Sequence, residues 1–219
     1  MGDAKKLIVK PIAAADASKI IKSLHYSGKN VQNSQLHLGV FYKGRCGGAM
    51  QFGPSLDKRK MQPLVKGTLW NEFLELNRMA FADWLPRNGE SRCIAYAMRW
   101  IGKTYPQIKW VVSFADATQC GDGTIYRASG FVLTGIKTNT DLVQLPDGTI
   151  THSFNMKASI PGGTFHHLIK DGESFTKTCK RIGAVPLVGH QLRYLFFIDP
   201  ACRENLTVPV LPYSEIVRQ

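Results

Sequence analysis

A strongly apolar segment, residues 108–115, constrains the fold of this 219-residue chain more than any other feature. Its Ile, Trp, Val and Phe side chains predict a central, buried β-strand. Asp116 follows this segment directly, and a carboxylate at the end of a buried strand is costly unless it is paired, hydrated or used. Asp116 is therefore our first candidate functional residue. The alternative is that Asp116 is a loop acid or a helix cap ahead of Thr118.

Helix and strand patterns alternate around this central strand. A turn at residues 86–91 leads into an apolar stripe of helical period that ends at Pro106. A short helix is expected at residues 124–129, and Gly130 separates it from a strand at residues 131–136. The order strand, helix, strand, helix, strand predicts an α/β core with helices layered on a sheet.

The N-terminal part is expected to add the edge of that sheet. Residues 6–12 read as a first strand, and Asp16 is expected to cap a helix that Gly28 ends. His25 and Tyr26 fall on the last turn and exit of this helix. Alternation of apolar and polar residues predicts three further strands: Leu36–Tyr42, Cys46–Phe52 and Phe73–Phe81.

The C-terminal part carries weaker patterns. Residues 144–152 resemble a hairpin, residues 172–183 contain a basic helix, and residues 191–198 form a last strand. The basic residues of that helix are Lys177, Lys180 and Arg181. We interpret the chain as one domain, 1–219, with a core at about 6–140 and a C-terminal extension at about 141–219.

The charge of the chain predicts a polyanionic partner. The sequence has 28 Lys and Arg against 16 Asp and Glu, a net charge of +12, which favours nucleic acid as a partner. The loop at residues 53–68 is rich in Pro, Gly and Lys and shows no helical period; the alternative for its charges is a merely solvated surface. The expected phosphate contacts in that loop are Lys58, Arg59, Lys60 and Lys66, with Lys177, Lys180 and Arg181 as further candidates.

The remaining composition narrows the class of protein. No apolar run reaches the roughly 20 residues that cross a bilayer, so a cytoplasmic protein without membrane contact is expected. The five cysteines lack metal-site spacing and are expected to be reduced thiols; they are Cys46, Cys93, Cys120, Cys179 and Cys202. His166 and His167 are interpreted as a loop pair because no third ligand stands at a recognisable spacing.

The order of elements resembles the GNAT N-acyltransferase fold, as does the phrase Tyr126-Arg127-Ala128-Ser129-Gly130-Phe131. This resemblance implies a mixed, mostly antiparallel sheet flanked by helices and suggests an acyl-CoA-type donor. The turn Arg87-Asn88-Gly89-Glu90-Ser91-Arg92 departs from the GNAT phosphate turn, because it carries a glutamate and lacks glycines that the GNAT motif has. The donor and any metal requirement are therefore left open, and Arg87, Gly89 and Arg92 are candidates for donor binding.

Five short motifs, in one order along roughly residues 7–136, resemble the Mom family of phage DNA-modification proteins. They are His25-Tyr26-Ser27, Leu38-Gly39-Val40, Glu75-Leu76-Asn77-Arg78, residues 88–92 and Ser113-Phe114-Ala115-Asp116. The resemblance implies a transferase that puts a carbamoylmethyl group on the exocyclic amine of adenine. The modified phage DNA, which is double-stranded DNA, would then escape restriction enzymes in the host cytoplasm. The donor of the group would be small or carrier-bound.

The same resemblance assigns roles. Asp116 would be the base, with its pKa raised by desolvation. His25 and Tyr26 would orient the adenine ring, stack on it or relay a proton. Such a pair alone more often packs or caps a helix. Arg78 would clamp a phosphate or carboxylate, with a salt bridge as its alternative.

Three other residues complete the predicted site. Ser91 would hold the donor, or simply cap the helix that starts there. Tyr126 stands where GNAT enzymes keep a general acid, and packing is an equal alternative. Tyr42 also carries over from the family as a binding residue. The competing functions are an acyl-CoA-dependent N-acyltransferase acting on a small amine or protein, and a basic DNA-binding protein without catalysis.

Overall fold

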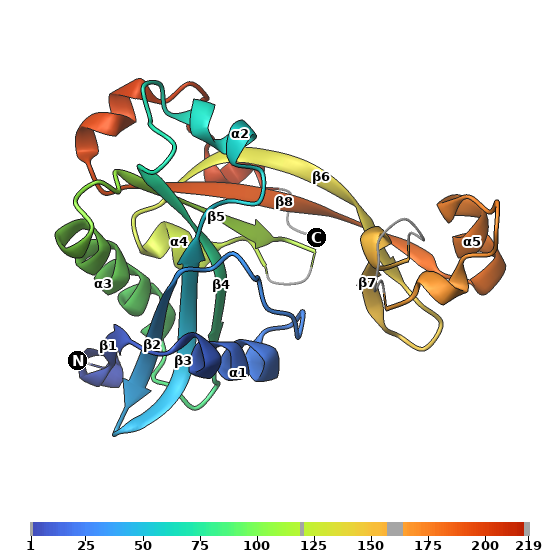
Figure 1. The fold of residues 1–219 in the computed structure, drawn as a ribbon, viewed down its shortest axis with the longest axis horizontal. Helices are drawn as coiled ribbons and strands as arrows, with labels where there is room; N and C mark the ends of the chain where they lie inside the picture. Colours follow the sequence, from blue (N-terminus) through green and yellow to red (C-terminus); the bar gives the residue numbers. More distant parts are fainter. Residues whose placement is uncertain (1, 119–120, 157–163, 217–219) are drawn as a thin grey trace. The chain divides into compact units, whose positions relative to one another are not determined.

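The structure is a computed structural model that describes residues 2–118, 121–156 and 164–216 (Figure 1). Contacts divide the chain into two compact units. The first unit contains residues 1–115, 122–135 and 192–219, and the second contains residues 116–121 and 136–191. The single domain expected from the sequence stays a prediction.

Eight strands are connected in the order β1-β2-β3-β4-β5-β8-β6-β7. The pairs from β1 to β4 are antiparallel, and β4 pairs with β5 in parallel. The strands are β1 Ile8–Pro11, β2 Leu36–Tyr42, β3 Arg45–Gly53, β4 Phe73–Phe81, β5 Trp110–Asp116, β6 Val132–Gln144, β7 Ile150–His152 and β8 Val185–Phe197. The predicted mixed, mostly antiparallel sheet flanked by helices is confirmed.

Helix α1, Ala14–Leu24, covers one face of the first strands. Its buried residues Ala17 and Ile21 pack against Ala49 of β3 and Ala80 of β4. Small residues on the strands let the helix approach closely, which packs the interface densely. Because side chains alternate along a strand, the next residues on this face lie beyond the end of α1. They are polar, and they form the site described below.

Strands β4 and β5 pair over only part of their length. The recorded partners are Phe73 with Trp110, Leu74 with Val111 and Glu75 with Val112. Beyond Glu75, β4 continues its ladder with β3 alone, and a register shift between Gln51 and Phe52 leaves Asn77 without a partner in that ladder. Such a bulge bends the strand and redirects side chains. The polar residues of β4 therefore lie where the two central strands part.

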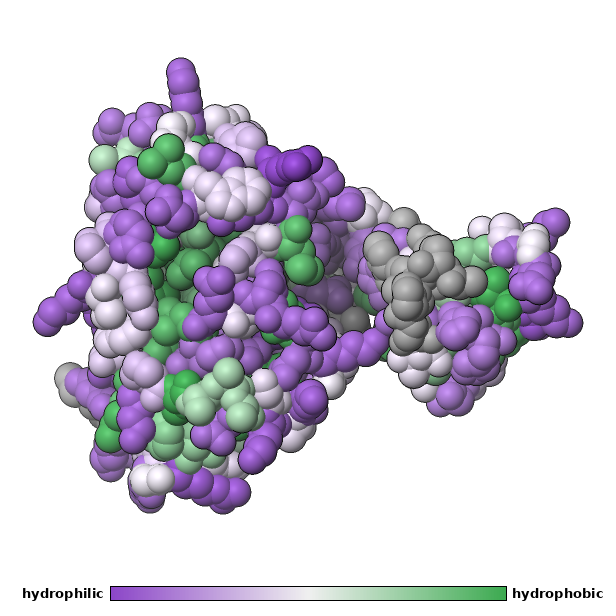
Figure 2. Space-filling model, in the orientation of Figure 1, coloured by the Kyte–Doolittle hydropathy of each residue, from purple (hydrophilic) through white to green (hydrophobic). Residues whose placement is uncertain are grey.

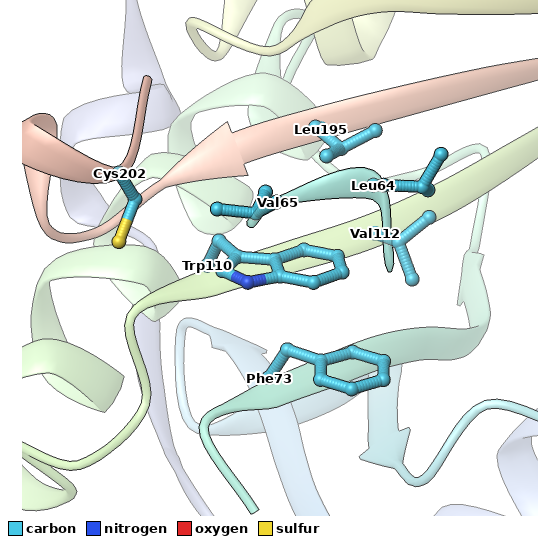
Figure 3. Close-up of a cluster of buried hydrophobic side chains, with 7 residues drawn as sticks. All are labelled: Leu64, Val65, Phe73, Trp110, Val112, Leu195 and Cys202. Atoms are coloured by element: carbon cyan, nitrogen blue, oxygen red, sulfur yellow. The ribbon is translucent and has the colours of Figure 1, made fainter. Parts of the chain in front are cut away.

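An aromatic core fastens the segment after β3 to the sheet (Figure 3). The Phe73 and Trp110 rings stack with centroids 4.4 Å apart, and the Trp110 Nε1–H donates to Thr68 Oγ1 at 3.0 Å. Leu64 and Val65 lie over the same rings. This burial fixes the middle of the long connection between β3 and β4.

Helices α3, Gly89–Thr104, and α4, Thr124–Ala128, follow β4 and β5. The buried stripe of α3 contains Cys93, Ile94, Ala97, Met98 and Ile101, as its period predicts. The Ser129 hydroxyl donates to the Ser91 carbonyl at 3.2 Å, so the residue that ends α4 is tied to the first turn of α3.

The second unit has a small core of its own. It consists of Val143, Leu145, Met156, Cys179 and Ala184. Helix α5, Phe175–Ile182, begins at Ser174, whose side chain accepts a hydrogen bond from the Lys177 N–H, and ends at Gly183, which has a φ of 72°. Both signals are those the sequence uses to start and stop a helix.

Several predicted boundaries are wrong. Helix α1 starts after Ala13, whose carbonyl accepts from the N–H groups of Asp16 and Ala17, so Asp16 is not the cap. The helix ends at Leu24 rather than at Gly28. The 53–68 loop contains a helical turn, α2 Lys58–Met61, and a 3₁₀ turn, Gln62–Leu64. Strand β8 begins at Val185, six residues earlier than the 191–198 pattern suggests.

Among the described residues, no helix is both long and apolar enough to cross a membrane. The thiols of Cys46, Cys93, Cys179 and Cys202 are free, as predicted, whereas Cys120 lies outside the described residues.

Candidate functional site

The exit of α1 and the middle of β3 and β4 bring six polar side chains together. This polar cluster consists of His25, Asn33, Gln51, Glu75, Asn77 and Arg78. Gln51 pairs with Arg78 across β3 and β4, and Gly53 pairs with Glu75 in the same ladder. The loop after α1 closes over them because Gly53 has no side chain. A Cβ there would lie 2.4 Å from the Asn33 carbonyl oxygen.

Glu75 supplies the carboxyl of the polar cluster. Burial raises its pKa, while hydrogen bonds with Ser55 and Asn77 and the charge of Arg78 act in the opposite direction. The network continues from Asn77, whose amide donates to the Pro54 carbonyl at 3.4 Å and whose Oδ1 accepts from the Ser34 hydroxyl at 3.0 Å. A raised pKa makes a carboxylate a better proton acceptor.

His25 is neutral in this setting. Burial and, secondarily, the charge of Arg78 lower its pKa from 6.5 to about 4. Its Nδ1 accepts from the Ser27 N–H at 3.1 Å, so the ring proton is on Nε2. The Tyr26 ring stacks on it with centroids 4.3 Å apart and is 54% exposed. This pair presents a neutral N–H donor and a flat aromatic surface.

Buried acceptors of the polar cluster lack partners. Within the described residues, Asn33 Oδ1 and Gln51 Oε1 are buried without a hydrogen bond, as is Oδ1 of the nearby Asn30. Gln51 is only 1% exposed. The Asn33 amide donates to the Pro54 carbonyl at 2.5 Å, which identifies Oδ1 as the unsatisfied atom. Unsatisfied buried acceptors call for a donor, and an amino group is one such donor.

Arg78 is oriented by backbone oxygens. Its Nη1 donates to the Asn77 carbonyl at 2.8 Å and its Nε to the Lys29 carbonyl at 3.4 Å. Among the described residues Arg78 makes no salt bridge, so the alternative proposed for it is not what holds the side chain. Its positive charge is available to an anionic group near the polar cluster.

A second polar site is a cleft of about 600 Å³ at the start of α3. It is lined by Ala82, Asp83, Leu85, Pro86, Arg87, Asn88, Glu90, Ser91, Thr124, Ile125 and Ala128. Free N–H groups at a helix start favour anions, and Arg87 adds a positive charge, although Glu90 and Asp83 oppose it. We refer to it as the α3 cleft.

The residues predicted for this turn have different positions. Ser91 lines the α3 cleft but is not the cap, because Asn88 precedes the helix and the Ser91 hydroxyl donates to its carbonyl at 3.4 Å. Gly89 is buried, and a Cβ on it would lie 2.9 Å from a Leu7 methyl, so it serves packing. Arg92 is exposed and is not among the residues that line the cleft.

Tyr126 is 7% exposed and packs in an aromatic group. Its ring centroid lies 5.4 Å from Phe131 and 5.3 Å from Tyr194. This is the arrangement that the packing alternative predicts. Its role as a general acid stays a prediction.

Tyr42 lies at the hairpin end of β2, five residues beyond His37, which faces Gln51. That separation is roughly 17 Å along a strand. The Tyr42 hydroxyl donates to Asp3 Oδ2 at 2.5 Å. The structure therefore does not bring Tyr42 into the polar cluster.

Asp116 ends β5 and belongs to the second unit. Its Oδ1 accepts from the Thr118 N–H at 3.0 Å, the local turn expected of a loop acid. Its role as the base stays a prediction.

The expected DNA contacts lie in and after α2. Arg59, Lys60 and Lys66 are exposed, and Lys58 is half-buried with its Nζ 4.5 Å from the centroid of the Trp70 ring. Lys60 also pairs with Asp57 at 2.6 Å. No group of three or more His, Cys, Asp or Glu that could hold a metal occurs in the part of the chain that the structure describes.

Neither Gln51 nor Asn33 nor Glu75 was singled out as a site residue from the sequence. A signal was present: Glu75 and Asn77 are polar residues on a strand whose neighbours are apolar. The burial of Gln51 had no such signal, because it depends on what packs over β3 in the folded chain.

Known proteins with similar sequences point to one family. A family model described as the Mom protein family matches residues 6–215. The methylcarbamoylase mom of Escherichia phage Mu is 37% identical over 215 residues, which cover 96% of this chain and 85% of that protein.

Solved structures similar in fold are acetyltransferases with little sequence identity. An IAA acetyltransferase from Bacillus cereus has a TM-score of 0.48 at 12% identity and covers 87% of this chain and 99% of its own. A spermidine/spermine N-acetyltransferase from Vibrio cholerae has a TM-score of 0.49 at 10% identity, and the match covers 92% of this chain and 98% of that protein. The sequence match spans nearly the whole chain, and on that evidence this protein belongs to the Mom protein family.

Proposed function

We propose that this protein is a DNA-modifying transferase that adds a carbamoylmethyl group to the exocyclic amine of adenine. The observation that carries the proposal is the 37% identity, over 96% of the chain, to a phage Mu protein named a methylcarbamoylase. The net charge of +12 supports DNA as the partner. The polar cluster supports an amine as the group that is modified.

The chemistry requires a base. The lone pair of the adenine amine is delocalised into the ring, so the amine becomes nucleophilic only as it loses a proton. The N–C bond forms while the donor's leaving group departs with its bonding electron pair, and the amine proton passes to a carboxylate. Neutral His25 and exposed Tyr26 are suited to hold the base ring beside that carboxylate.

The α3 cleft is our candidate for the anionic part of the donor. Its helix N-terminus and Arg87 favour a phosphate or carboxylate. Ala82 of the cleft follows Glu75 by seven residues, which is up to roughly 23 Å along an extended strand. An extended donor would therefore reach from the cleft toward the polar cluster.

The mass of deoxyadenosine in DNA from cells that express the protein tests the function. We expect a nucleoside heavier by one carbamoylmethyl group in exchange for one hydrogen. Unchanged deoxyadenosine at good expression would contradict the proposal. The same DNA should resist restriction enzymes whose sites contain adenine.

Two carboxylates compete for the role of base. Asp116 is the prediction from the sequence, and Glu75 is the candidate that the geometry adds. Asp116→Asn and Glu75→Gln should be compared for modified nucleoside per cell and for DNA affinity. The residue that acts as the base is the one whose substitution by the amide lowers the modification rate about 100-fold or more while DNA binding is unchanged.

A further inference from the structure

The 54–71 segment, between β3 and β4, exposes three large apolar side chains among basic ones. Leu56 is 81% exposed, Leu69 61% and Trp70 51%. The cations of the same segment are Lys58, Arg59, Lys60 and Lys66. In Figure 2, hydrophobic and hydrophilic surface alternates over the region where Figure 1 places α2. We refer to Leu56, Leu69 and Trp70 as the apolar ridge.

The apolar ridge stands on an anchored support. Leu64 and Val65 are buried in the aromatic core, Val65 bridges to Leu206, and the Thr207 N–H donates to the Leu64 carbonyl at 2.9 Å. The backbone of Leu69 is held by Glu72, whose Oε2 accepts its N–H at 2.7 Å. The exposed side chains are therefore presented by a fixed backbone, which lowers the entropy cost of using them in binding.

The same segment starts at the polar cluster. Pro54 accepts hydrogen bonds from Asn33 and Asn77, and Ser55 is hydrogen-bonded to Glu75. Leu56 is the next residue along the chain, and its side chain is in solvent. Leu56 of the apolar ridge is thus the chain neighbour of a residue that contacts the Glu75 carboxyl.

Lys58 links α2 to the other end of the apolar ridge. Its Nζ lies 4.5 Å from the Trp70 centroid and 5.5 Å from that of Phe73. The ammonium group is thus held beside an exposed aromatic side chain by a cation–π contact. Cations beside stacking surfaces are the pattern of surfaces that bind nucleic acid.

We propose that the 54–71 segment docks on duplex DNA and that its apolar ridge unstacks the target base beside the polar cluster. The proposal rests on the proposed function in taking DNA as the partner. Charge complementarity selects DNA as the occupant, because phosphates match the four cations that flank the apolar side chains. Apolar side chains pushed between base steps open the stack at a cost that the phosphate contacts repay. An adenine must leave the stack before a carboxylate in a partly buried site can reach its amine.

Duplexes that carry 2-aminopurine at adenine positions test the proposal, because the fluorescence of that base rises when it unstacks. The unsubstituted protein is compared with Leu69→Ala and Trp70→Ala. Trp84→Ala is the matched control, since Trp84 is also exposed and lies under a cation, Arg45, at 4.7 Å. Lys66→Ala separates phosphate contact from unstacking. Circular dichroism of each variant verifies the fold.

We expect Trp70→Ala and Leu69→Ala to lose most of the fluorescence rise and to weaken DNA binding about 5-fold to 100-fold. Lys66→Ala should weaken binding, reduce the salt slope by about one and keep the rise once DNA is saturated. Trp84→Ala should change neither measurement.

An undiminished fluorescence rise in both ridge variants would overturn the proposal, and so would DNA binding that no substitution in the segment alters. The second result would point to a protein or a second copy of the chain as the occupant. The unsubstituted protein could unstack 2-aminopurine, lose this effect in the ridge variants, and yet leave deoxyadenosine unmodified in cells. That combination would refute the proposed function and leave the docking proposal standing.

Discussion

Glu75 is a half-buried carboxyl among polar neighbours. Burial raises its pKa, so the charged form is disfavoured in the folded state. The stability that its carboxyl contributes is fully present below its unfolded pKa and is lost as pH rises through the raised folded pKa. Glu75→Gln should therefore raise the melting temperature at pH 8 and much less at pH 4, by about 2–4 °C for each 1 kcal/mol of stability regained. Scanning calorimetry at both values measures this, with exposed Glu204→Gln as the control.

His25 makes stability depend on pH in the opposite direction. Its pKa is about 4 in the folded protein against 6.5 ordinarily, so the unfolded state takes up a proton first. The stability is intact above pH 6.5 and falls as pH decreases toward 4. An NMR titration, with the resonance assigned by its absence in His25→Gln, should give a midpoint near 4. A midpoint at or above 6.5 would contradict the burial of this ring.

At the scale of elements, the end of β3 decides whether the polar cluster closes. A Cβ on Gly53 would lie 2.4 Å from the Asn33 carbonyl oxygen and 2.8 Å from Ser34 Cα, and neither backbone atom can rotate away. Gly53→Ala should cost about 1–3 kcal/mol in the free energy of unfolding, measured by urea titration. Gly2→Ala, with nothing within 4 Å, is the matched control and should stay within about 0.5 kcal/mol.

Elements with a long, clean period were predicted well from the sequence. Strand β4 and helix α3 lie where alternation and the helical stripe place them. Helix α2 was missed because four residues are too few to show a period. The start of β8 was missed because Pro186 and Gly189 interrupt the pattern, and only pairing in the sheet makes those residues a strand.

At the scale of the whole molecule, the charge is unevenly divided. The first unit has 22 Lys and Arg against 11 Asp and Glu, whereas the second has six against five. In the second unit Arg181 is already bound to Glu173 at 2.7 Å. We therefore expect the first unit to supply most of the phosphate contacts, and Lys177 and Lys180 to matter less than the sequence suggests.

A double variant tests this division. Lys177→Ala with Lys180→Ala should leave DNA affinity within about twofold and the salt slope nearly unchanged, whereas Lys58→Ala with Lys66→Ala should lower the slope by about two. Fluorescence anisotropy over a range of salt concentrations measures both. A larger loss in the second-unit variant would show that α5 contacts DNA.

The sequence by itself determined the order of elements and the family, because periodicity and short motifs are properties of neighbouring residues. It also supplied His25, Tyr26 and Arg78 through motifs that carry over from relatives. Only the tertiary structure joined them to Gln51, Asn33 and Glu75. The physical reason is that their burial depends on a bulge at Asn77 and on a loop closing over Gly53. Neither the bulge nor the loop closure can be predicted from the residue pattern of a single segment.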